Sequence, residues 1–332
     1  MKPKAIYLLD TDAFAVVFGH DEQRELASLL EFVAPPLTAR SWLAHRDAAR
    51  EAEVILTGWG TPAMDADFLA HFPALRAVFH AGGTVKHFVT DALWSRGVRV
   101  TCAAAMNAIP VAEFTISQVI FCLKHGWQRA REVREEHCFR KEDEHMPGAY
   151  ARTVGLLSLS RTGRLVAEHL RRFDLRVIAY DPVVPPSEAA ALGVRLCSLD
   201  EVFATADIVS CHTPLLPATK HLLRASHFSQ MKPGATFINT ARGPIVHEIE
   251  LLDVLARRPD LFALLDVTDP EPPAANSRLF SLPNVVVTPH IAGSLGPECL
   301  RLGRMAVDEA RRYILGEPLQ GEVSREQMSR VA

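Results

Sequence analysis

Three short segments near the end of the chain carry side chains that can bind an anion and move a proton. Arg242 lies in "FINTARGPIVHE", and His290 lies in "NVVVTPHIAG". Asp266 and Glu271 lie between them, in "FALLDVTDPEPP". Each segment contains an apolar run that predicts a strand, and ligands bind beyond the carboxyl ends of strands in open parallel sheets. We therefore expect a guanidinium, carboxylates and an imidazole to meet in one crevice.

These residue types suit proton transfer to a carbonyl oxygen. A histidine donates or accepts the proton, and a neighbouring carboxylate favours the imidazolium and fixes the ring orientation. An arginine offers a planar set of donors that holds a carboxylate and polarises a ketone. Each residue alone also has a structural interpretation: His290 as a surface or core histidine, Arg242 as a surface charge, and Glu271 as part of a proline turn.

A second segment, "VGLLSLSRTGRLVAEHLRRFDLRVIAYDP" (residues 154–182), resembles a dinucleotide-binding βαβ unit with an altered loop. The fingerprint Gly-x-Gly-x-x-Gly has Ser158, Ser160 and Gly163 at its three glycine positions. A serine that needs positive φ is strained, so we expect weakened cofactor binding that Ser160→Gly restores. The alternative is a structural strand–turn–helix that has lost its ligand.

Other features of this segment favour binding. The helix N-terminus remains an anion site, and a serine hydroxyl can donate to phosphate. Arg161 stands beside the loop, and Asp181 ends the next strand, where an acid accepts from ribose hydroxyls and repels a 2′-phosphate.

Short apolar runs alternate with helical patterns along most of the chain, which predicts parallel sheets built from βαβ units. The predicted strands are residues 5–9, 54–57, 77–80 and 98–102, then 154–157, 177–180, 208–212, 236–239, 263–266 and 285–288. The predicted helices are residues 22–32, 111–129, 163–173, 248–256 and 297–315. Between the two strand series, "REEHCFRKEDEHMPGAY" is charged and predicts a surface excursion. We expect the last helix to return to the first domain.

The composition of the 332 residues is that of an ordinary α/β protein of about two domains, 48% apolar and 23% charged. A net charge of −3 provides no basic field for nucleic acid or an anionic membrane. We expect no membrane span and no signal peptide, because the apolar stretches are too short. Six cysteines without C-x-x-C spacing predict reduced, buried thiols in a cytoplasmic protein, with no metal site.

Taken together, the segments resemble the D-isomer-specific 2-hydroxyacid dehydrogenases, which include glyoxylate/hydroxypyruvate reductases and phosphoglycerate dehydrogenases. The resemblance rests on "VAEF" (111–114), the altered loop (158–163), "HTPL" (212–215), "MKPGATFINTARG" (231–243), "DVTDPEP" (266–272) and "NVVVTPHIAG" (284–293). It implies an α/β fold of two Rossmann-like parallel-sheet domains, one flavodoxin-like and one dinucleotide-binding, with a cleft between them. Residues 1–107 and 298–332 would form the substrate-binding domain, and residues 108–297 the dinucleotide-binding domain.

The resemblance also implies roles. Arg242, Glu271 and His290 are the catalytic residues, Asp266 holds the nicotinamide amide, and Asp181 binds the ribose. The expected cofactor contacts are Ser158, Ser160, Arg161, Thr162, Gly163, Asp181, His212, Thr213, Pro214, Thr240, Ala241, Asp266 and His290. The expected substrate contacts are Ala81, Gly82, Gly83, Thr84 and Arg242.

The implied activity is NAD-dependent hydride transfer with a small 2-keto or 2-hydroxy acid, in a homodimer formed near the helix at 111–129. A rival hypothesis is an NAD(H)-sensing protein with little or no turnover, which the two serines favour and the retained triad disfavours. Oxidation of formate or phosphite is a third hypothesis, and Glu271 argues against it because formate dehydrogenases of this superfamily pair their histidine with glutamine. His247 stands where the family often has an acid.

Overall fold

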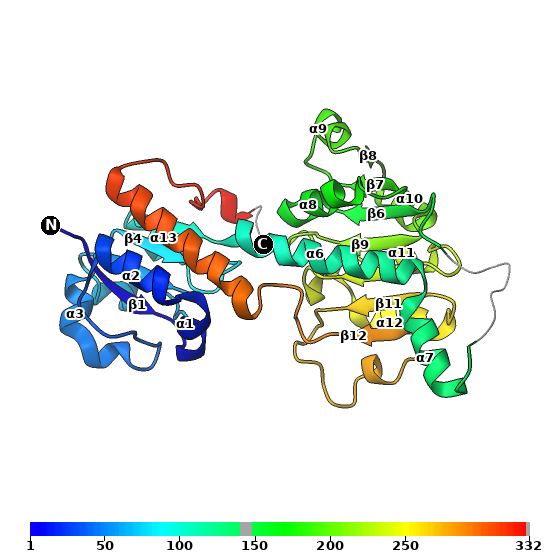
Figure 1. Cartoon of the computed structure of the whole chain (residues 1–332), viewed down its shortest axis with the longest axis horizontal. Coiled ribbons are helices and arrows are strands. Elements are labelled where there is room, and N and C mark those ends of the chain that lie inside the picture. Colours follow the sequence, from blue (N-terminus) through cyan, green and yellow to red (C-terminus); the bar gives the residue numbers. More distant parts are fainter. Residues whose placement is uncertain (140–147, 330–332) are drawn as a thin grey trace. The chain divides into compact units, whose positions relative to one another are not determined.

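The computed structural model describes residues 1–139 and 148–329 and divides the chain into two compact units (Figure 1). The first unit comprises Met1–Ala108 and Ser294–Ala332, and the second comprises Ile109–Gly293. The first crossing lies one residue later than predicted and the second four residues earlier. Each unit is an α/β layer structure with one parallel sheet, as predicted from the alternation of strands and helices.

The first unit contains a five-stranded parallel sheet in the order β2-β1-β3-β4-β5. The strands are β1 (Lys4–Leu8), β2 (Glu31–Phe32), β3 (Val54–Thr57), β4 (Ala77–His80) and β5 (Arg99–Cys102). Its helices are α1 (Thr11–Val17), α2 (His20–Leu29), α3 (Arg46–Glu51), α4 (Ala66–Ala70), α5 (Asp91–Ser95) and α13 (Cys299–Leu315).

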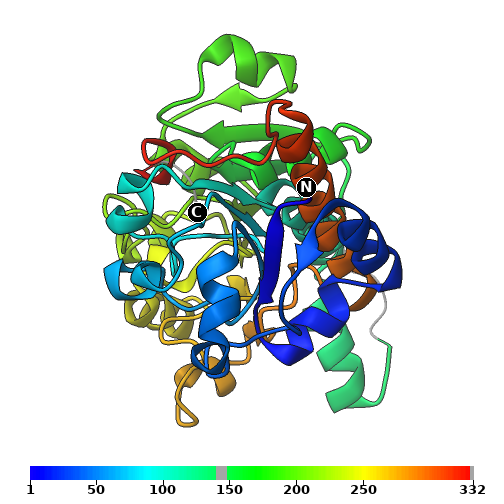
Figure 2. The ribbon, with the colours of Figure 1, turned by 90° about the vertical axis from the view of Figure 1, so that its left-hand side faces the viewer.

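Helices cover both faces of this sheet because its strands are apolar on both sides. Along β1, Ala5 and Tyr7 pack with α1, α2 and α13, whereas Ile6 and Leu8 pack with α3, α4 and α5. Figure 2 shows these two groups of helices on opposite sides of the blue strand β1. The predicted return of the last helix to the first unit is therefore confirmed.

The second unit contains a seven-stranded parallel sheet in the order β12-β11-β10-β9-β6-β7-β8. The strands are β6 (Thr153–Leu157), β7 (Arg176–Tyr180), β8 (Arg195–Leu196), β9 (Ile208–Cys211), β10 (Thr236–Asn239), β11 (Phe262–Leu265) and β12 (Val285–Val287). Its helices are α7 (Gly126–Glu136), α8 (Arg161–Leu170), α9 (Pro186–Ala191), α10 (Leu199–Thr205), α11 (Ala225–Ser229) and α12 (Glu248–Arg257).

This strand order determines where a ligand fits. From β6 the chain moves outward to β7 and β8, and then returns to place β9 on the other side of β6. The loops after β6 and β9 therefore diverge, and the crevice at such a switch point binds dinucleotides in folds of this order. The serine loop follows β6, so the fold places it where the fingerprint loop belongs.

The helix predicted at 111–129 is wrong at both ends. Helix α6 begins seven residues earlier and spans Ala104–Leu123, and α7 is a separate helix. His125 has a left-handed φ of 52° and breaks the chain of helical hydrogen bonds between them. The charged stretch predicted as a surface excursion continues α7 as far as Glu136, and residues 140–147 lie outside the described part of the chain.

The expectation that no stretch is long enough to span a membrane is also wrong. Among the described residues, α6 is long and apolar enough by length and composition. Core helices pass the same test, and Ala112, Val119 and Cys122 of α6 lie in a buried cluster with Val154 of β6. The helix therefore covers one face of the second sheet.

Several smaller differences have local causes. The helix predicted at 22–32 ends at Leu29, because Glu31 and Phe32 form the edge strand β2. The helix predicted at 163–173 is α8, which begins earlier at Arg161 and ends at Leu170. Strands β2 and β8 have two residues each, too short to show alternation in the sequence. Cys138 is exposed and Cys197 is half-buried, against the prediction of buried thiols, and none of the six cysteines forms a disulfide.

Two buried histidines lie at the carboxyl ends of strands. His80 ends β4 and lies 2.8 Å from the Thr57 hydroxyl through Nδ1, and His212 follows β9 with Nε2 3.0 Å from the Ser210 hydroxyl. Only 3% and 4% of their surfaces are exposed. Burial lowers the pKa of each to about 3, so both rings are neutral at physiological pH.

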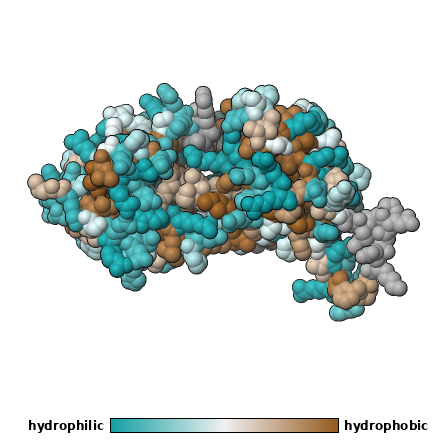
Figure 3. Space-filling model, turned by 45° about the horizontal axis from the view of Figure 1, so that its top comes forward, coloured by the Kyte–Doolittle hydropathy of each residue, from teal (hydrophilic) through white to brown (hydrophobic). Residues whose placement is uncertain are grey.

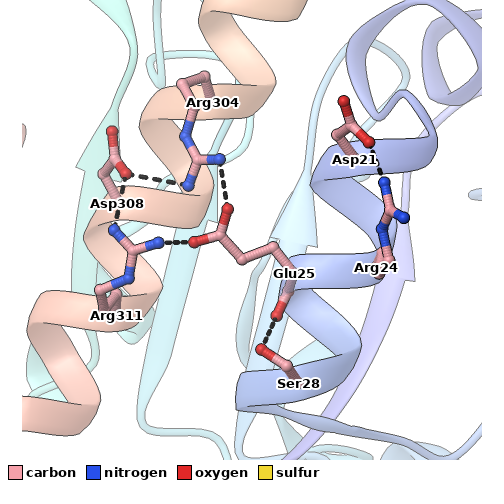
Figure 4. A network of polar contacts seen from close by, with 7 residues as sticks. All are labelled: Asp21, Arg24, Glu25, Ser28, Arg304, Asp308 and Arg311. Atoms are coloured by element: carbon pink, nitrogen blue, oxygen red, sulfur yellow. Dashed lines mark hydrogen bonds and ion pairs between the residues drawn. The ribbon is translucent and has the colours of Figure 1, made fainter.

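A network of ion pairs connects α13 with α2 within the first unit (Figure 4). Glu25 of α2 pairs with Arg304 at 2.5 Å and with Arg311, and Asp308 bridges the two arginines. Asp21 and Arg24 form a separate, more exposed pair on α2. The network therefore connects residues that are far apart in the sequence.

The surface shown in Figure 3 is mainly hydrophilic, with apolar side chains in small groups. Exposed large apolar residues include Trp59 in the first unit and Phe121 in the second. Scattered residues of this kind are normal on a folded surface.

Replacing Glu25 by alanine leaves two guanidinium groups without their shared carboxylate. We expect a loss of about 1 kcal/mol in the free energy of unfolding, which shrinks when salt is added. Urea denaturation followed by tryptophan fluorescence, at low and high salt, measures this loss. Asp21→Ala is the matched control on the same helix and should have almost no effect. Equal effects of the two variants would show that the network does not stabilise the α2–α13 contact.

The buried histidines predict acid sensitivity. Their folded pKa of about 3 lies below the ordinary 6.5, so the unfolded chain takes up protons first. The stabilisation is complete above pH 6.5 and is lost as the pH falls towards 3. Each histidine accounts for about 2 kcal/mol of the loss between pH 7 and pH 5. His212→Gln should reduce the pH dependence of unfolding by about that amount, whereas exposed His20→Gln should leave it unchanged. A His212→Gln variant with the full pH dependence would contradict this assignment.

Candidate active site

The central pair of the site is His290 and Glu271, both in the second unit. Nδ1 of His290 lies 2.5 Å from Oε1 of Glu271, and the Thr268 amide donates to the other carboxylate oxygen at 3.3 Å. The carboxylate is thus held from its own loop while it contacts the ring. Because Nδ1 faces the carboxylate, Nε2 is the ring nitrogen turned away from it. The two side chains are 46% and 40% exposed, so the pair is accessible to a ligand.

Asp266 anchors the loop that carries His290. This residue is 1% exposed, and its carboxylate accepts from the Thr288 hydroxyl at 2.6 Å and from the amides of Ile291 and Ala292 at 2.8 and 2.9 Å. The His290 amide also donates to the Asp266 carbonyl oxygen at 3.0 Å. His290 itself has a left-handed φ of 54°, a conformation that costs free energy and persists only where the surroundings fix it.

Arg242 follows β10 on a neighbouring loop. Asn239 holds this turn, because its side-chain amide donates to the Arg242 carbonyl at 3.1 Å. Gly243 lies directly against the Thr268 carbonyl, where a Cβ would overlap it, so the Arg242 loop touches the Glu271 loop. Burial lowers the pKa of Arg242 and the charge of Glu271 acts in the opposite direction; the guanidinium stays charged.

The two serines of the altered loop have different conformations. Ser158 has φ of 77°, so it carries the backbone strain that a glycine would avoid. Ser160 has φ of −60°, caps α8 by accepting from the Gly163 amide, and donates to the His212 carbonyl at 2.8 Å. The strain argument therefore applies to Ser158 and not to Ser160, and tighter NADH binding by Ser160→Gly stays a prediction without that physical reason. Gly163 keeps its glycine role, because a Cβ there would overlap the Ser158 carbonyl oxygen.

Asp181 lies beside this loop at the end of β7. Oδ2 accepts from the Ser158 hydroxyl at 3.0 Å and from the Leu159 amide at 2.8 Å. Oδ1 accepts from the amides of Val183 and Val184 at 2.8 and 3.0 Å. The pKa of Asp181 is lowered: burial raises it, and these four donors lower it by more.

The remaining expected cofactor residues lie at the same edge of the sheet. Thr213 follows β9 and donates through its hydroxyl to the Leu157 carbonyl of β6 at 3.2 Å. Thr240 follows β10, and its hydroxyl lies 3.0 Å from that of Thr115 in α6. Ala241 donates its amide to Asn239, and Arg161 and Thr162 form the first turn of α8. Pro214 accepts from Thr219 at 2.6 Å.

The loop of Ala81, Gly82, Gly83 and Thr84 belongs to the first unit. It leaves β4 at the carboxyl edge, with the Ala81 amide donating to Thr57 at 2.9 Å. The neutral His80 ring lies directly against Gly82. Two glycines in succession let backbone amides approach an anion closely.

Sequence reasoning missed three residues that support these loops. Thr268 holds Glu271, and Glu248 accepts from the Asp269 amide at 3.0 Å. Asn107 of the first unit lies against Gly83 and accepts from the Ser294 amide at 3.0 Å. Nothing in their spacing marks these contacts, because each depends on how loops fold back. Among the described residues no group of three potential metal ligands occurs.

Comparison with known proteins gives these positions a family context. Residues 116–292 match the family described as "D-isomer specific 2-hydroxyacid dehydrogenase, NAD binding domain", which assigns NAD as the cofactor of the second unit. D-3-phosphoglycerate dehydrogenase of Mycobacterium bovis is 35% identical over 270 residues, 81% of this chain and 51% of that protein. The chain spans about half the length of the curated relatives it matches.

Solved structures share the fold over nearly the whole chain. A phosphoglycerate oxidoreductase from Rhizobium etli has a TM-score of 0.82 at 22% identity, covering 99% of this chain and 100% of its own. The NAD-complexed D-isomer specific 2-hydroxyacid dehydrogenase from Lactobacillus delbrueckii ssp. bulgaricus has a TM-score of 0.80 at 22% identity, covering 97% and 100%. The predicted fold class of two Rossmann-like parallel-sheet α/β domains is confirmed. Because residues 116–292 match the family model and the chain is 35% identical to the Mycobacterium bovis protein over 81% of its length, the chain belongs to the D-isomer specific 2-hydroxyacid dehydrogenase family.

Proposed function

We propose that this chain is an NAD(H)-dependent oxidoreductase that transfers a hydride between nicotinamide and a small 2-keto or 2-hydroxy acid of D configuration. The observation that carries the proposal is the 2.5 Å contact between His290 and Glu271 in a chain of this family. A buried carboxylate, Asp266, fixes the loop that carries the imidazole. This arrangement suits a proton donor that must keep one orientation through many turnovers.

The side chains divide the work of the reduction. The bound nicotinamide supplies the hydride to the carbonyl carbon. His290 gives the proton of its Nε2 to the carbonyl oxygen, and the carboxylate of Glu271 stabilises the imidazolium through Nδ1 before that transfer. In the oxidative direction the neutral imidazole takes the hydroxyl proton. Arg242 polarises the carbonyl and binds the substrate carboxylate, because its planar donors match both oxygens.

The fold supports the cofactor contacts that we propose. The first turn of α8, with Ser160, Arg161 and Thr162, offers amides and a positive helix end to the pyrophosphate. Asp181 accepts from the ribose, and Thr213, Pro214, Thr240 and Ala241 line the cofactor site with His212. The carboxylate of the buried Asp266 accepts hydrogen bonds from the loop that carries His290. The role that we propose for Asp266 at the nicotinamide amide therefore includes holding that loop in place. The loop of Ala81 to Thr84 receives the substrate carboxylate.

A second candidate function is an NAD(H)-sensing protein with little turnover. The strained Ser158 and the fully engaged Asp181 favour it, because both oppose tight cofactor binding. The acid–base pair favours the enzyme. We also propose a cytoplasmic homodimer, formed near α6 as the family resemblance implies.

Turnover tests the proposal directly. NADH oxidation should occur with at least one of glyoxylate, hydroxypyruvate, pyruvate and longer 2-keto acids. His290→Ala should lower kcat by about 10²–10⁴-fold, the usual contribution of a general acid, while NADH binding by fluorescence titration changes little. Exposed His20→Ala, on α2 of the first unit, is the control. A His290→Ala variant that turns over normally would remove the imidazole from the mechanism.

Asp181 predicts the choice between cofactors. A carboxylate beside the 2′ position repels the phosphate of NADPH, and a like-charge contact costs several kcal/mol, so kcat/KM should favour NADH by about a hundredfold or more. Asp181→Asn should reduce the ratio of kcat/KM with NADH to kcat/KM with NADPH, because it removes the repulsion of the 2′-phosphate. Steady-state kinetics with both cofactors measures it, and equal kcat/KM values in the parent chain would argue against Asp181 at the ribose.

A further inference from the structure

The Asp181 carboxylate has no acceptor position to spare. A carboxylate offers about four lone-pair sites, and Asp181 uses four donors of this chain. Three of these donors are backbone amides, those of Leu159, Val183 and Val184. The fourth is the hydroxyl of Ser158, at 3.0 Å from Oδ2.

These four donors differ in how easily they leave. The amides belong to the turns after β6 and β7, so their departure would require the backbone of both loops to move. The Ser158 hydroxyl leaves by rotation about one side-chain bond. It is therefore the donor that an incoming hydroxyl can replace.

We propose that the Ser158 hydroxyl occupies the acceptor site on Asp181 to which a ribose hydroxyl of the cofactor donates, so that Ser158 sets the affinity for the adenosine half of NAD(H). The inference rests on the proposed ribose role of Asp181. When the cofactor binds, Asp181 exchanges its hydrogen bond from Ser158 for one from the ribose. The gain in binding free energy is therefore smaller than at a carboxylate with an open acceptor site. A glycine at 158 would present no competing donor.

The backbone of Ser158 supports this interpretation. A serine at φ of 77° is strained, and its hydrogen bond to the Asp181 carboxylate offsets part of that cost in the cofactor-free state. The same bond then holds the β6 turn to the end of β7. Ser160 makes no such contact with Asp181, since its hydroxyl bonds to Gly163 and His212.

The test compares two ligands that differ only in the ribose hydroxyls, ADP and 2′,3′-dideoxyadenosine 5′-diphosphate. By isothermal titration calorimetry, Ser158→Ala should bind ADP about three- to tenfold more tightly than the parent chain, a gain of up to about 1.4 kcal/mol. Its affinity for the dideoxy ligand should not change. Ser160→Ala is the matched serine control and should change the affinities for both ligands by the same factor.

Two further variants keep the test decisive. Ser158→Gly also lacks the hydroxyl and removes the strained Cβ, so it carries the test if Ser158→Ala fails to fold by circular dichroism. In an Asp181→Ala background, Ser158→Ala should have no effect on ADP, because the shared acceptor is gone. Unchanged or weaker ADP binding in both Ser158 variants, or a gain that persists without Asp181, overturns the inference.

The turnover assay separates this inference from the proposed function. A chain that reduces a 2-keto acid with NADH, yet whose Ser158 variants bind ADP no more tightly, keeps the proposed function and loses the inference. A chain without turnover whose Ser158 variants gain ADP affinity through Asp181 keeps the inference and loses the oxidoreductase function.

Discussion

The candidate site depends on one buried carboxylate. Asp266 accepts three hydrogen bonds from residues 288–292, and its burial makes these bonds hard to replace with water. They hold His290 in a left-handed backbone conformation that it would not adopt alone. The imidazole then lies within hydrogen-bond distance of Glu271, on the neighbouring loop. The exposed His290–Glu271 pair is thus oriented by a buried carboxylate.

The proposed cofactor side of the site relies on backbone groups more than on side chains. There the proposed anion site is made of backbone at the start of α8, which is insensitive to side-chain identity, and Asp181 is the residue we propose for selectivity towards the ribose. The serine at 158 introduces strain and a hydrogen bond together, and the two act in opposite directions on the folded chain. Under our proposal, their net effect on cofactor binding acts through Asp181, the carboxylate for which Ser158 and the ribose compete.

Much of this organisation is predictable from the sequence. The strands that carry the site are apolar runs bounded by turn residues, so β10, β11 and β12 and the side chains after them were found within one residue. Two-residue edge strands give no periodicity, and the left-handed residue at the α6–α7 break is His125, not the glycine that follows it. The sequence also could not distinguish Ser158 from Ser160, because φ depends on how the loop closes against β7. Likewise, the commitment of Asp266 to the His290 loop depends on contacts between residues more than twenty positions apart.

The named substrate of the relatives does not extend to this chain by similarity alone. The family match covers residues 116–292, which belong to the second unit, where the proposed acid–base pair and the proposed cofactor residues lie. The loop of Ala81 to Thr84, proposed to receive the substrate carboxylate, lies in the first unit and outside that match. For the proposed reaction, groups that contact the rest of the substrate would determine which 2-keto acid is accepted, since a pocket discriminates by the contacts it makes or leaves unpaired. The residues proposed for proton transfer therefore lie in the second unit, and the choice of acid must be measured for this chain.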